Sequence, residues 1–299
     1  MTLTIAALVT NYNTWNLTLR CTQAIAKLSG DQITQILVMD DASDEEMPDQ
    51  LPNRVRVIRN PENLGLLANT NRGFAHLEED IIILFDSDAY PLVDATAILR
   101  PKFMHNPRLG ALVFQTVDEV GNSTASWQSA PDVFGLLLGQ KLEAIYRSWW
   151  KSGDQKPILG YQCAVAIRRS AFVEIGGFDE GFDWLDADLD FSLRLHAAGW
   201  QVAVEPELKA FHKGGGTFQL TSARVMRHHK NRWRLLAKHH LIPYPGLLKL
   251  GLATRHTLEY IMLRLAGSFL FSHKSIVQDK IKSRRQLLQS VWSGYGNDA

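Results

Sequence analysis

The sequence predicts an α/β fold, in which a sheet flanked by helices is followed by a helical C-terminal extension. Two observations support this fold class. Within the first hundred residues, an apolar strand, a polar turn and an amphipathic helix follow one another repeatedly. From about Thr221 onward the pattern is helical, with a break near residues 242–246. Alternation of strands and helices is typical of a largely parallel sheet whose strands are joined by crossover helices.

The strands are predicted from short runs of branched apolar residues. Four of these runs end in polar or acidic residues, and parallel strands would bring those ends to one edge of the sheet. The helices are predicted from apolar residues at helical spacing and from glycines that follow the last turn. The predicted strands cover 4–10, 35–40, 55–60, 81–86, 161–169 and 200–207, with a further strand and turn within 109–122. The predicted helices cover about 14–28, 134–150 and 186–198, with a turn and helix within 63–77.

The composition is that of an ordinary globular protein of 299 residues, with 45% apolar and 21% charged residues. Two cysteines, Cys21 and Cys163, are too few for a disulfide framework, which indicates a reducing compartment. Residues 1–13 alternate like a strand and lack the basic start and the cleavage site of a signal peptide. We therefore expect a cytoplasmic protein.

The charge is unevenly distributed along the chain. Residues 220–299 contain 14 Lys and Arg against three acids, a net charge of +11, which leaves −10 for residues 1–219 because the formal total is +1. A basic helical segment suits an anionic lipid surface or a nucleic acid, or is simply a solvated helical face. The acidic part is suited to a bound cation.

The stretch "IIILFDSDAYP" at 81–91 places Asp86 and Asp88 at the end of a buried strand. Ligands of open α/β sheets bind beyond the carboxyl ends of the strands. Carboxylates there suit Mg²⁺ or Mn²⁺, which bind proteins through one or two acids together with substrate phosphates. His212, just before three glycines, is a candidate third ligand or a phosphate contact. Turn formation by the aspartates alone is the competing interpretation.

Polar residues also follow the second strand and lie on the next helix. Asp40 is expected to accept hydrogen bonds from a base or a ribose, whereas Asp41 and Asp44 equally suit a turn or a helix cap. Asn71 and Arg72 are candidates for the same crevice. Arg72 would reach a phosphate there or remain solvated.

Three acids in five residues, Asp186, Asp188 and Asp190, open the helix predicted near 186–198. Acids in a first helical turn are favoured by the helix dipole, and Asp186 is placed to cap the helix. The dipole is expected to keep Asp188 ionised at neutral pH. An ionised carboxylate can accept a proton from an alcohol, so Asp188 is the candidate general base.

Taken in this order, these stretches resemble the inverting family 2 glycosyltransferases of the GT-A fold, especially the bacterial rhamnosyltransferase-like group. The resemblance covers about residues 3–240. It implies a Rossmann-like mixed sheet and divides the chain into a GT-A domain at 1–219 and a basic helical extension at 220–299. The residues it implies for the nucleotide, the metal and the donor are Thr10, Asn13, Asp40, Asp86 and Asp88.

The resemblance implies Asp188 as the base, with Asp186 as the second candidate. The chain departs from the family here, because Ala187 stands where the family usually has Glu. It departs again near Gln162, where the family usually has a glycine. Both departures lie on the acceptor side of the implied site.

The implied reaction is an in-line displacement that moves a hexosyl or deoxyhexosyl group from a UDP-, GDP- or dTDP-linked donor to a hydroxyl of a glycan or a lipid-linked acceptor, with inversion. Cell-surface polysaccharide synthesis at the inner face of the membrane, with peripheral contact through residues 220–299, fits the basic extension. Mg²⁺ or Mn²⁺ is the expected cofactor. No nucleic acid is expected as a partner, because residues 1–219 are acidic.

Three other functions compete with this hypothesis. A nucleotidyltransferase would open with a Gly-rich loop containing Arg, and "LVTNYNTWN" has neither residue type. A catalytically silent nucleotide- or sugar-binding module would explain the loss of Glu at position 187. A nucleic-acid binder would act through the basic C-terminal segment and would show salt-dependent retention.

Overall fold

The computed structural model describes residues 2–139, 142, 157–212, 221–270 and 274–296. The chain forms two compact units. The first comprises residues 1–130 and 156–216, and the second comprises 131–155 and 217–299. The predicted division after residue 219 does not set 131–155 apart from the first part. The predicted helix at 134–150 is described only over its first residues, and most of it lies outside the described residues.

Eight strands form the main sheet of the first unit, and two more form a small ladder. The eight are β1 (Ile5–Asn11), β2 (Ile36–Asp40), β3 (Val55–Arg59), β4 (Ile81–Asp86), β5 (Ala89–Pro91), β6 (Leu109–Val117), β9 (Ala164–Arg168) and β10 (Gln201–His212). The ladder pairs β7 (Trp127–Ser129) with β8 (Ile158–Gly160).

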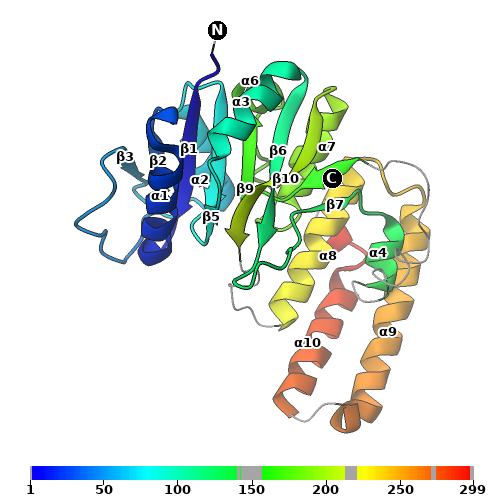
Figure 1. Ribbon diagram of the computed structural model, residues 1–299. Helices are drawn as coiled ribbons and strands as arrows, with labels where there is room; N and C mark the ends of the chain where they lie inside the picture. The colour runs from blue at the N-terminus through cyan, green and yellow to red at the C-terminus, as the bar shows by residue number, and fades with distance from the viewer. Residues whose placement is uncertain (1, 140–141, 143–156, 213–220, 271–273, 297–299) are drawn as a thin grey trace. The chain divides into compact units, whose positions relative to one another are not determined.

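The strand order is β3-β2-β1-β4-β9-β6-β10-β5 (Figure 1). The first four strands are parallel, β9 runs antiparallel to both β4 and β6, and β5 is antiparallel to β10. This is the mixed sheet that the family resemblance implies. The strand β10 runs to His212 and is therefore longer than the predicted 200–207.

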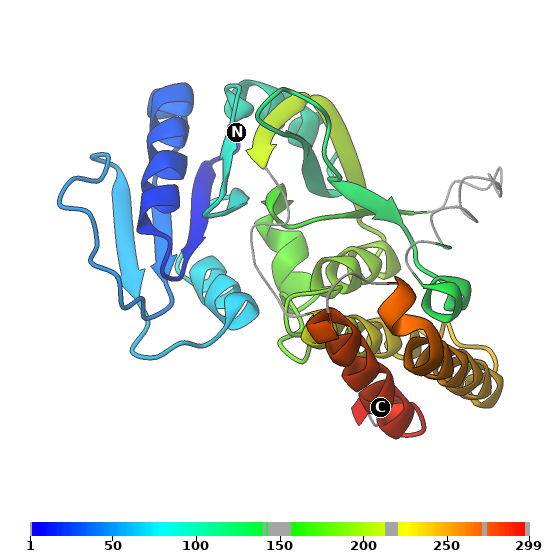
Figure 2. The ribbon, with the colours of Figure 1, turned by 90° about the horizontal axis from the view of Figure 1, so that it is seen from below.

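Helices cover both faces of this sheet. They are α1 (Trp15–Ser29), α2 (Leu66–Ala75), α3 (Ala95–His105), α6 (Arg169–Glu174) and α7 (Ala187–Ala197). The views of Figures 1 and 2 show α1 and α2 on opposite sides of β1. Every residue of β1 is buried, because its alternate side chains point to these two helical layers.

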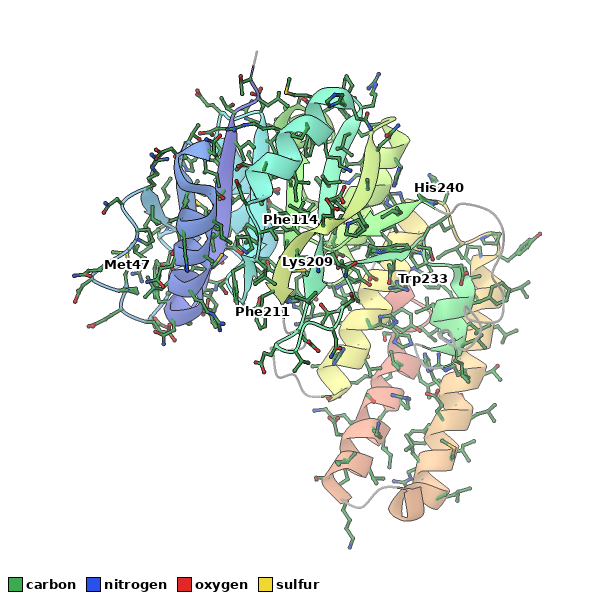
Figure 3. The ribbon with its side chains drawn as sticks, in the orientation of Figure 1. Met47, Phe114, Lys209, Phe211, Trp233 and His240 are labelled. Carbon is green, nitrogen blue, oxygen red and sulfur yellow. The ribbon has the colours of Figure 1, made fainter. Side chains whose placement is uncertain are left out.

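Alternate residues of β1 define the two layers. Ile5, Ala7 and Val9 belong to a core that also contains apolar residues of α1 and α3, such as Ile25. Phe114, labelled in Figure 3, lies in the same core. Leu8 faces the other way, against α2. A strand buried on both faces reads as a continuous apolar run, which is why the sequence located these strands well.

The second unit is helical. It contains α4 (Val133–Leu138), α8 (Thr221–Lys238), α9 (Pro245–Leu270), α10 (Lys274–Ser290) and the short 3-10 helix η2 (Gly294–Gly296). The helix α10 packs against both α8 and α9, and Figure 1 shows α9 and α10 side by side. The core of this unit includes Trp233, labelled in Figure 3, together with Leu252, Leu287 and Tyr295. The predicted helix break near 242–246 is confirmed by the turn between α8 and α9.

Charged residues on the helices of this unit pair with one another. Glu259 accepts from Arg255 Nε at 2.8 Å and from Arg284 Nε at 2.5 Å. Its side chain is 23% exposed. Among the described residues, no helix has the combination of length and apolar character needed to cross a bilayer.

Gly73 sets how closely α2 approaches the sheet. A Cβ at this position would lie 2.6 Å from Leu8 Cδ1 and 2.9 Å from Met39 Cγ. We expect Gly73→Ala to lower the free energy of unfolding by about 1–3 kcal/mol, because the added carbon overpacks the interface. Urea titration measures this change. Gly246→Ala is the control, since nothing lies within 4 Å of its added Cβ. Equal stabilities of the two variants would contradict the overpacking.

Candidate active site

The carboxyl ends of β1, β2 and β4 lie side by side. In the strand register Asn11 pairs with Asp40, and Thr10 pairs with Asp86. The chain continues from β1 to β2 and β3 on one side, whereas β4 joins β1 on the other. This change of direction creates a switch point, the usual ligand position of open α/β sheets. The structure therefore brings the predicted residues Thr10, Asp40 and Asp86 to one edge.

Asp40 is fully buried at this edge. Its Oδ1 accepts from Asn11 Nδ2 at 2.7 Å and also from Ser43 Oγ. Its Oδ2 lies 3.4 Å from Arg59 Nε. The carboxylate thus fixes the loops after β1 and β2 and orients Arg59. A direct bond to a nucleotide base, as predicted, requires Asp40 to exchange one of these partners.

Asn13 joins the loops that follow β1 and β2. Its backbone has φ of 53°, a left-handed conformation that asparagine tolerates better than most residues. Its Oδ1 accepts from the backbone nitrogens of Asp44 at 2.7 Å and Glu45 at 3.3 Å. Its own backbone nitrogen donates to Ser43 Oγ at 2.8 Å. Asn13 therefore shapes the edge on which its predicted nucleotide contact would form.

Asp41 has the turn-forming role considered for it from the sequence. It accepts from Asn60 Nδ2 at 2.8 Å and from the backbone nitrogens of Leu64 and Gly65, both at 2.9 Å. These bonds hold the segment that leads into α2. Arg72, on α2, is exposed to solvent.

Asn71 connects α2 to the loop before α7. Its Nδ2 donates to the Phe178 carbonyl at 2.9 Å, and its Oδ1 accepts from the Phe178 backbone nitrogen at 2.8 Å. A Cβ on Gly177 would lie 2.7 Å from that same Oδ1. The amide predicted to face the crevice therefore binds backbone. A nucleotide contact by Asn71 would compete with this pair of bonds.

Asp86 and Asp88 lie close enough to repel each other. Burial, and next the charge of Asp88, raises the pKa of Asp86 from 3.8 to about 7. The Asp86 backbone nitrogen donates to the Cys163 carbonyl at 3.1 Å, which anchors the end of β4 to β9. The Asp88 side chain is 38% exposed, so it remains accessible to a ligand.

His212 reaches this pair through strand pairing. It is the last residue of β10 and lies opposite Ala89 in the antiparallel ladder with β5. Its Nε2 is 3.7 Å from Asp88 Oδ1. No local pattern in the sequence predicts the pairing of β5 with β10, yet this ladder places His212 beside Asp88.

The donor set fits a hard divalent cation. Two carboxylates suit Mn²⁺ or Mg²⁺, and the raised pKa of Asp86 reflects burial first and then the charge of Asp88, which a cation would offset. Within the described ranges, no cluster of three or more His, Cys, Asp or Glu is arranged to hold a metal ion. The protein ligands alone therefore do not complete the predicted site of Asp86, Asp88 and His212. Substrate phosphates are the usual additional ligands of Mg²⁺.

The start of α7 places two acids next to the crevice. Asp186 occupies the predicted cap position, with φ of 66°, but its side chain makes no capping hydrogen bond. Asp188 lies in the first helical turn, as predicted, and its Oδ1 accepts from the Leu189 backbone nitrogen at 2.9 Å. Ala187, which replaces the usual Glu of the family, is fully buried.

The expectation that the helix dipole keeps Asp188 ionised at neutral pH is wrong for the metal-free protein. Burial, and next the charge of Asp186, raises the pKa of Asp188 from 3.8 to about 8. Desolvation of a carboxylate disfavours its charged form, and here it exceeds the stabilisation from the helix N-terminus. The raised pKa favours the protonated form of the Asp188 carboxyl at neutral pH.

Cys163 shows that these acids share one site. It is a buried thiol whose pKa is raised by burial and then by the charges of Asp86, Asp188 and Asp88. The charge of Asp86 also contributes to the raised pKa of Asp188. The "DSD" segment and the start of α7 therefore face the same crevice.

Sequence reasoning missed several residues that build this crevice. Asn11 and Arg59 both bind Asp40. Each stands at the end of an apolar run, and this position is the sequence signal that could have identified them. Gln162 was noted only as a departure from the family. It is 8% exposed, and its Oε1 has no hydrogen-bond partner within the described part of the chain. It lines a small hollow together with Asp188 and Ser192.

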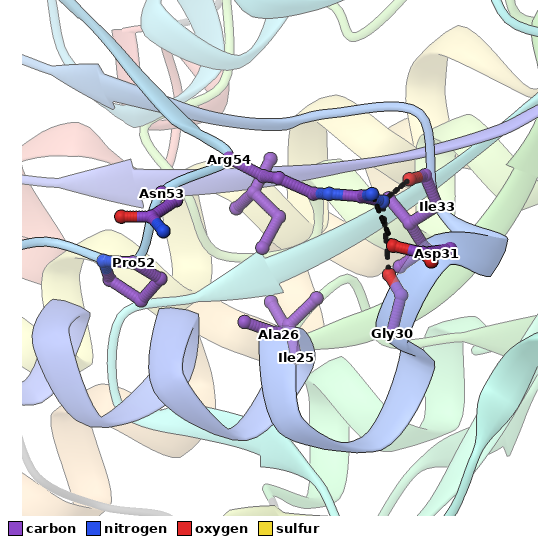
Figure 4. A pocket seen from close by; sticks show the side chains of 9 residues that line it. Ile25, Ala26, Gly30, Asp31, Ile33, Pro52, Asn53 and Arg54 are labelled. Atoms are coloured by element: carbon purple, nitrogen blue, oxygen red, sulfur yellow. Dashed lines mark hydrogen bonds and ion pairs between the residues drawn. The ribbon is translucent and has the colours of Figure 1, made fainter.

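A second hollow, of about 210 Å³, lies at the other end of the strands. Its lining includes Ile36 and Arg54, at the starts of β2 and β3, and Figure 4 shows Arg54 closing it. Arg54 Nη1 donates to the carbonyls of Gly30 at 3.2 Å and Ile33 at 3.1 Å. None of the predicted site residues lies in this hollow.

The sheet, its switch point and its cluster of acids define a nucleotide-sugar transferase type of fold. Residues 7–176 match glycosyl transferase family 2, which is more than half of the chain. The chain therefore belongs to this family, and it is a glycosyltransferase of the GT-A fold.

Two curated relatives and one solved structure are similar to this chain over most of its length. The chain is 26% identical over 247 residues to the N-acetylglucosaminyl-diphospho-decaprenol L-rhamnosyltransferase of Mycobacterium tuberculosis, covering 73% of this chain and 79% of the relative. It is also 26% identical over 228 residues to the inactive polypeptide N-acetylgalactosaminyltransferase-like protein 5 of Macaca fascicularis, covering 68% of this chain and 49% of that relative. A mannosyltransferase from Pyrobaculum calidifontis, solved with GDP-Man and Mn²⁺, shares the fold with a TM-score of 0.56 at 15% identity, covering 97% of this chain and 88% of that one.

The raised pKa of Asp188 predicts a pH-dependent effect on stability. A carboxyl whose pKa rises from 3.8 to about 8 on folding stabilises the fold below pH 3.8, and this contribution is lost as the pH rises to about 8. Asp188→Asn removes that loss. We therefore expect the variant to raise the melting temperature more at about pH 9 than at about pH 5, measured with EDTA present. The exposed Asp49→Asn serves as control, and equal effects of the two variants at both pH values would contradict the raised pKa of Asp188.

Proposed function

We propose that this chain transfers a hexosyl or deoxyhexosyl group from a nucleotide diphosphate to a hydroxyl of a glycan or lipid-linked acceptor, with inversion. The observation that carries the proposal is the convergence of Asp86, Asp88 and Asp188 around Cys163 in a family 2 chain. One pair of acids serves the donor and the third serves the acceptor.

The donor lies at the carboxyl ends of β1, β2 and β4. Thr10 and Asn13 line the nucleotide side, where Asp40 holds Arg59 in place. The side chain of Arg59 is 55% exposed, and its guanidinium offers donors to a base, a ribose or a phosphate. Arg72 on α2 is the second exposed cation proposed for the diphosphate.

Asp86, Asp88 and His212 would hold the divalent cation together with the diphosphate. When bound, the cation offsets the charge that develops on the leaving diphosphate. The Asp88 side chain is 38% exposed and is accessible to the cation. Asp86 is partly buried, and a bound cation would favour its ionised form.

Asp188 accepts the proton of the acceptor hydroxyl. Its raised pKa of about 8 suits a general base, because a base with a pKa near the working pH is both available and strong. The Gln162 Oε1, which lacks a partner among the described residues, lies in the same lining and is proposed to accept a hydrogen bond from the acceptor. Displacement from the side opposite the diphosphate inverts the anomeric carbon.

The similarity to the rhamnosyltransferase named above supports a lipid-linked acceptor and a deoxyhexose donor. The basic segment 220–299 supports contact with the anionic inner face of a membrane. Synthesis of a cell-surface polysaccharide is the process proposed for this combination.

A silent binding module is the second candidate function. Ala187 in place of Glu and the similarity to a protein named as inactive favour it. Hydrolysis of a nucleotide sugar in the absence of an acceptor distinguishes the two, because a binding module releases no free sugar.

The donor site is tested by nucleotide binding. We expect UDP, GDP or dTDP to bind at least about tenfold more tightly with Mn²⁺ than with EDTA, since the cation bridges protein and diphosphate. Asp88→Ala should abolish this gain, whereas Asp49→Ala, an exposed control, should retain it. Calorimetric titration measures both. Metal-independent binding by the parent protein, or an unchanged gain in Asp88→Ala, would refute the site.

The base is tested by separating binding from turnover. Asp188→Asn should bind the donor normally and transfer sugar at least about a hundredfold more slowly, because only proton transfer is lost. Initial rates and donor titrations on the same preparations make the comparison. A variant that keeps its turnover would show that Asp188 is not the base.

Asp186→Asn provides a contrasting test of the neighbouring acid. Asparagine tolerates the left-handed backbone at this position, and loss of the Asp186 charge lowers the pKa of Asp188. We expect near-parental maximal turnover with the pH profile shifted to lower pH. If Asp186→Asn is inactive at every pH and Asp188→Asn is active, their roles are exchanged.

A further inference from the structure

One face of α9 carries a row of large apolar side chains that the fold leaves exposed. At 100° per residue, six of these side chains fall within about 120° of the helix circumference and span about 27 Å along the helix axis. Their exposed fractions run from 47% to 77%. We call this set the α9 stripe, and it consists of Leu247, Leu250, Leu258, Ile261, Met262 and Leu265.

The stripe is not part of the core of its own unit. Leu248, Leu252 and Leu263, on another face of α9, are buried. His256, on the same buried face, is fully enclosed. Among the described residues, the unit therefore packs on one side of α9 and leaves the other side uncovered. A row of exposed large apolar side chains on one helix face is typical of an interaction site.

The exposed charged residues among the described parts of α9 and α10 are basic. The only acid on α9 is Glu259, and it is bound by Arg255 and Arg284. Asp279, the acid on α10, accepts from the Ser222 backbone nitrogen at 3.1 Å. Both acids are thus engaged within the unit. Exposed cations on α9 and α10 are Arg264, Lys274, Lys282 and Arg285.

We propose that the α9 stripe inserts into the interface of an anionic phospholipid bilayer, with α9 lying in the plane of the membrane. An apolar helix face flanked by basic residues matches acyl chains beneath anionic headgroups. A second copy of the chain fits less well, because residues 220–299 carry +11 and two copies would repel each other. The proposal specifies the surface for the membrane contact proposed above, and it is independent of the transfer reaction.

Vesicle co-sedimentation of the full chain tests the proposal. The parent protein should bind phosphatidylcholine vesicles that contain phosphatidylglycerol, and bind pure phosphatidylcholine vesicles weakly. Leu258→Ser/Leu265→Ser should weaken binding to the anionic vesicles at least about tenfold, because two large apolar side chains leave the interface. Val120→Ser/Val173→Ser, which removes two exposed apolar side chains from the first unit, should bind like the parent.

A labelled variant confirms the contact without relying on the folding of the double variant. The two native cysteines, Cys21 and Cys163, are buried, so a polarity-sensitive dye at Leu258→Cys labels the stripe selectively. Its emission should shift to the blue with anionic vesicles. The nucleotide affinity of the labelled protein should be unchanged, which separates this proposal from the donor site.

The contradicting outcomes differ from one another. If the parent protein binds neither vesicle, the membrane contact itself is wrong. If the parent and Leu258→Ser/Leu265→Ser bind equally and the dye does not shift, membrane contact is electrostatic and the stripe plays no part. If the dye shifts only as protein concentration rises, and sedimentation velocity shows a dimer that the double variant lacks, the stripe joins two copies of the chain.

Discussion

Repulsion between carboxylates at one sheet edge is the interaction on which the site depends. Asp188 lies about a hundred residues after Asp86 and Asp88 in the chain, yet the charges of all three act on the thiol of Cys163. Burial makes this crowding unfavourable, which the raised pKa values of Asp86 and Asp188 express. The repulsion between these carboxylates lowers the stability of the fold, and a bound cation would offset that repulsion.

The strands and the acids at their ends were predictable because they depend on local pattern. Parallel strands buried on both faces are long apolar runs, and a charge such as Asp86 at the end of such a run is conspicuous. The burial of Asp40 was not predictable, since it depends on Asn11 and Arg59 from neighbouring strands. The pairing of β5 with β10, which brings His212 to Asp88, has no local signal.

The start of α7 shows where rules for local structure fail. Helix-capping preferences correctly placed Asp186 at the N-cap, but they did not predict its left-handed backbone or the missing side-chain bond. The dipole argument for Asp188 considered the helix alone, whereas the pKa is governed by burial and by Asp186. Local stabilisation of charge is smaller than the cost of desolvation in such a crevice.

The double hydrogen bond between Asn71 and the backbone of Phe178 makes two distant segments interdependent. One segment is the helix α2, and the other leads into the helix that carries Asp188. Family members that differ in donor and acceptor are natural sources for chimeric enzymes. A chimera joined between α2 and the loop before α7 would keep its two halves aligned only if one parent supplies an amide at position 71 and the other supplies a glycine at 177. Exchange of acceptor preference by recombination is therefore restricted to parents that share this pair.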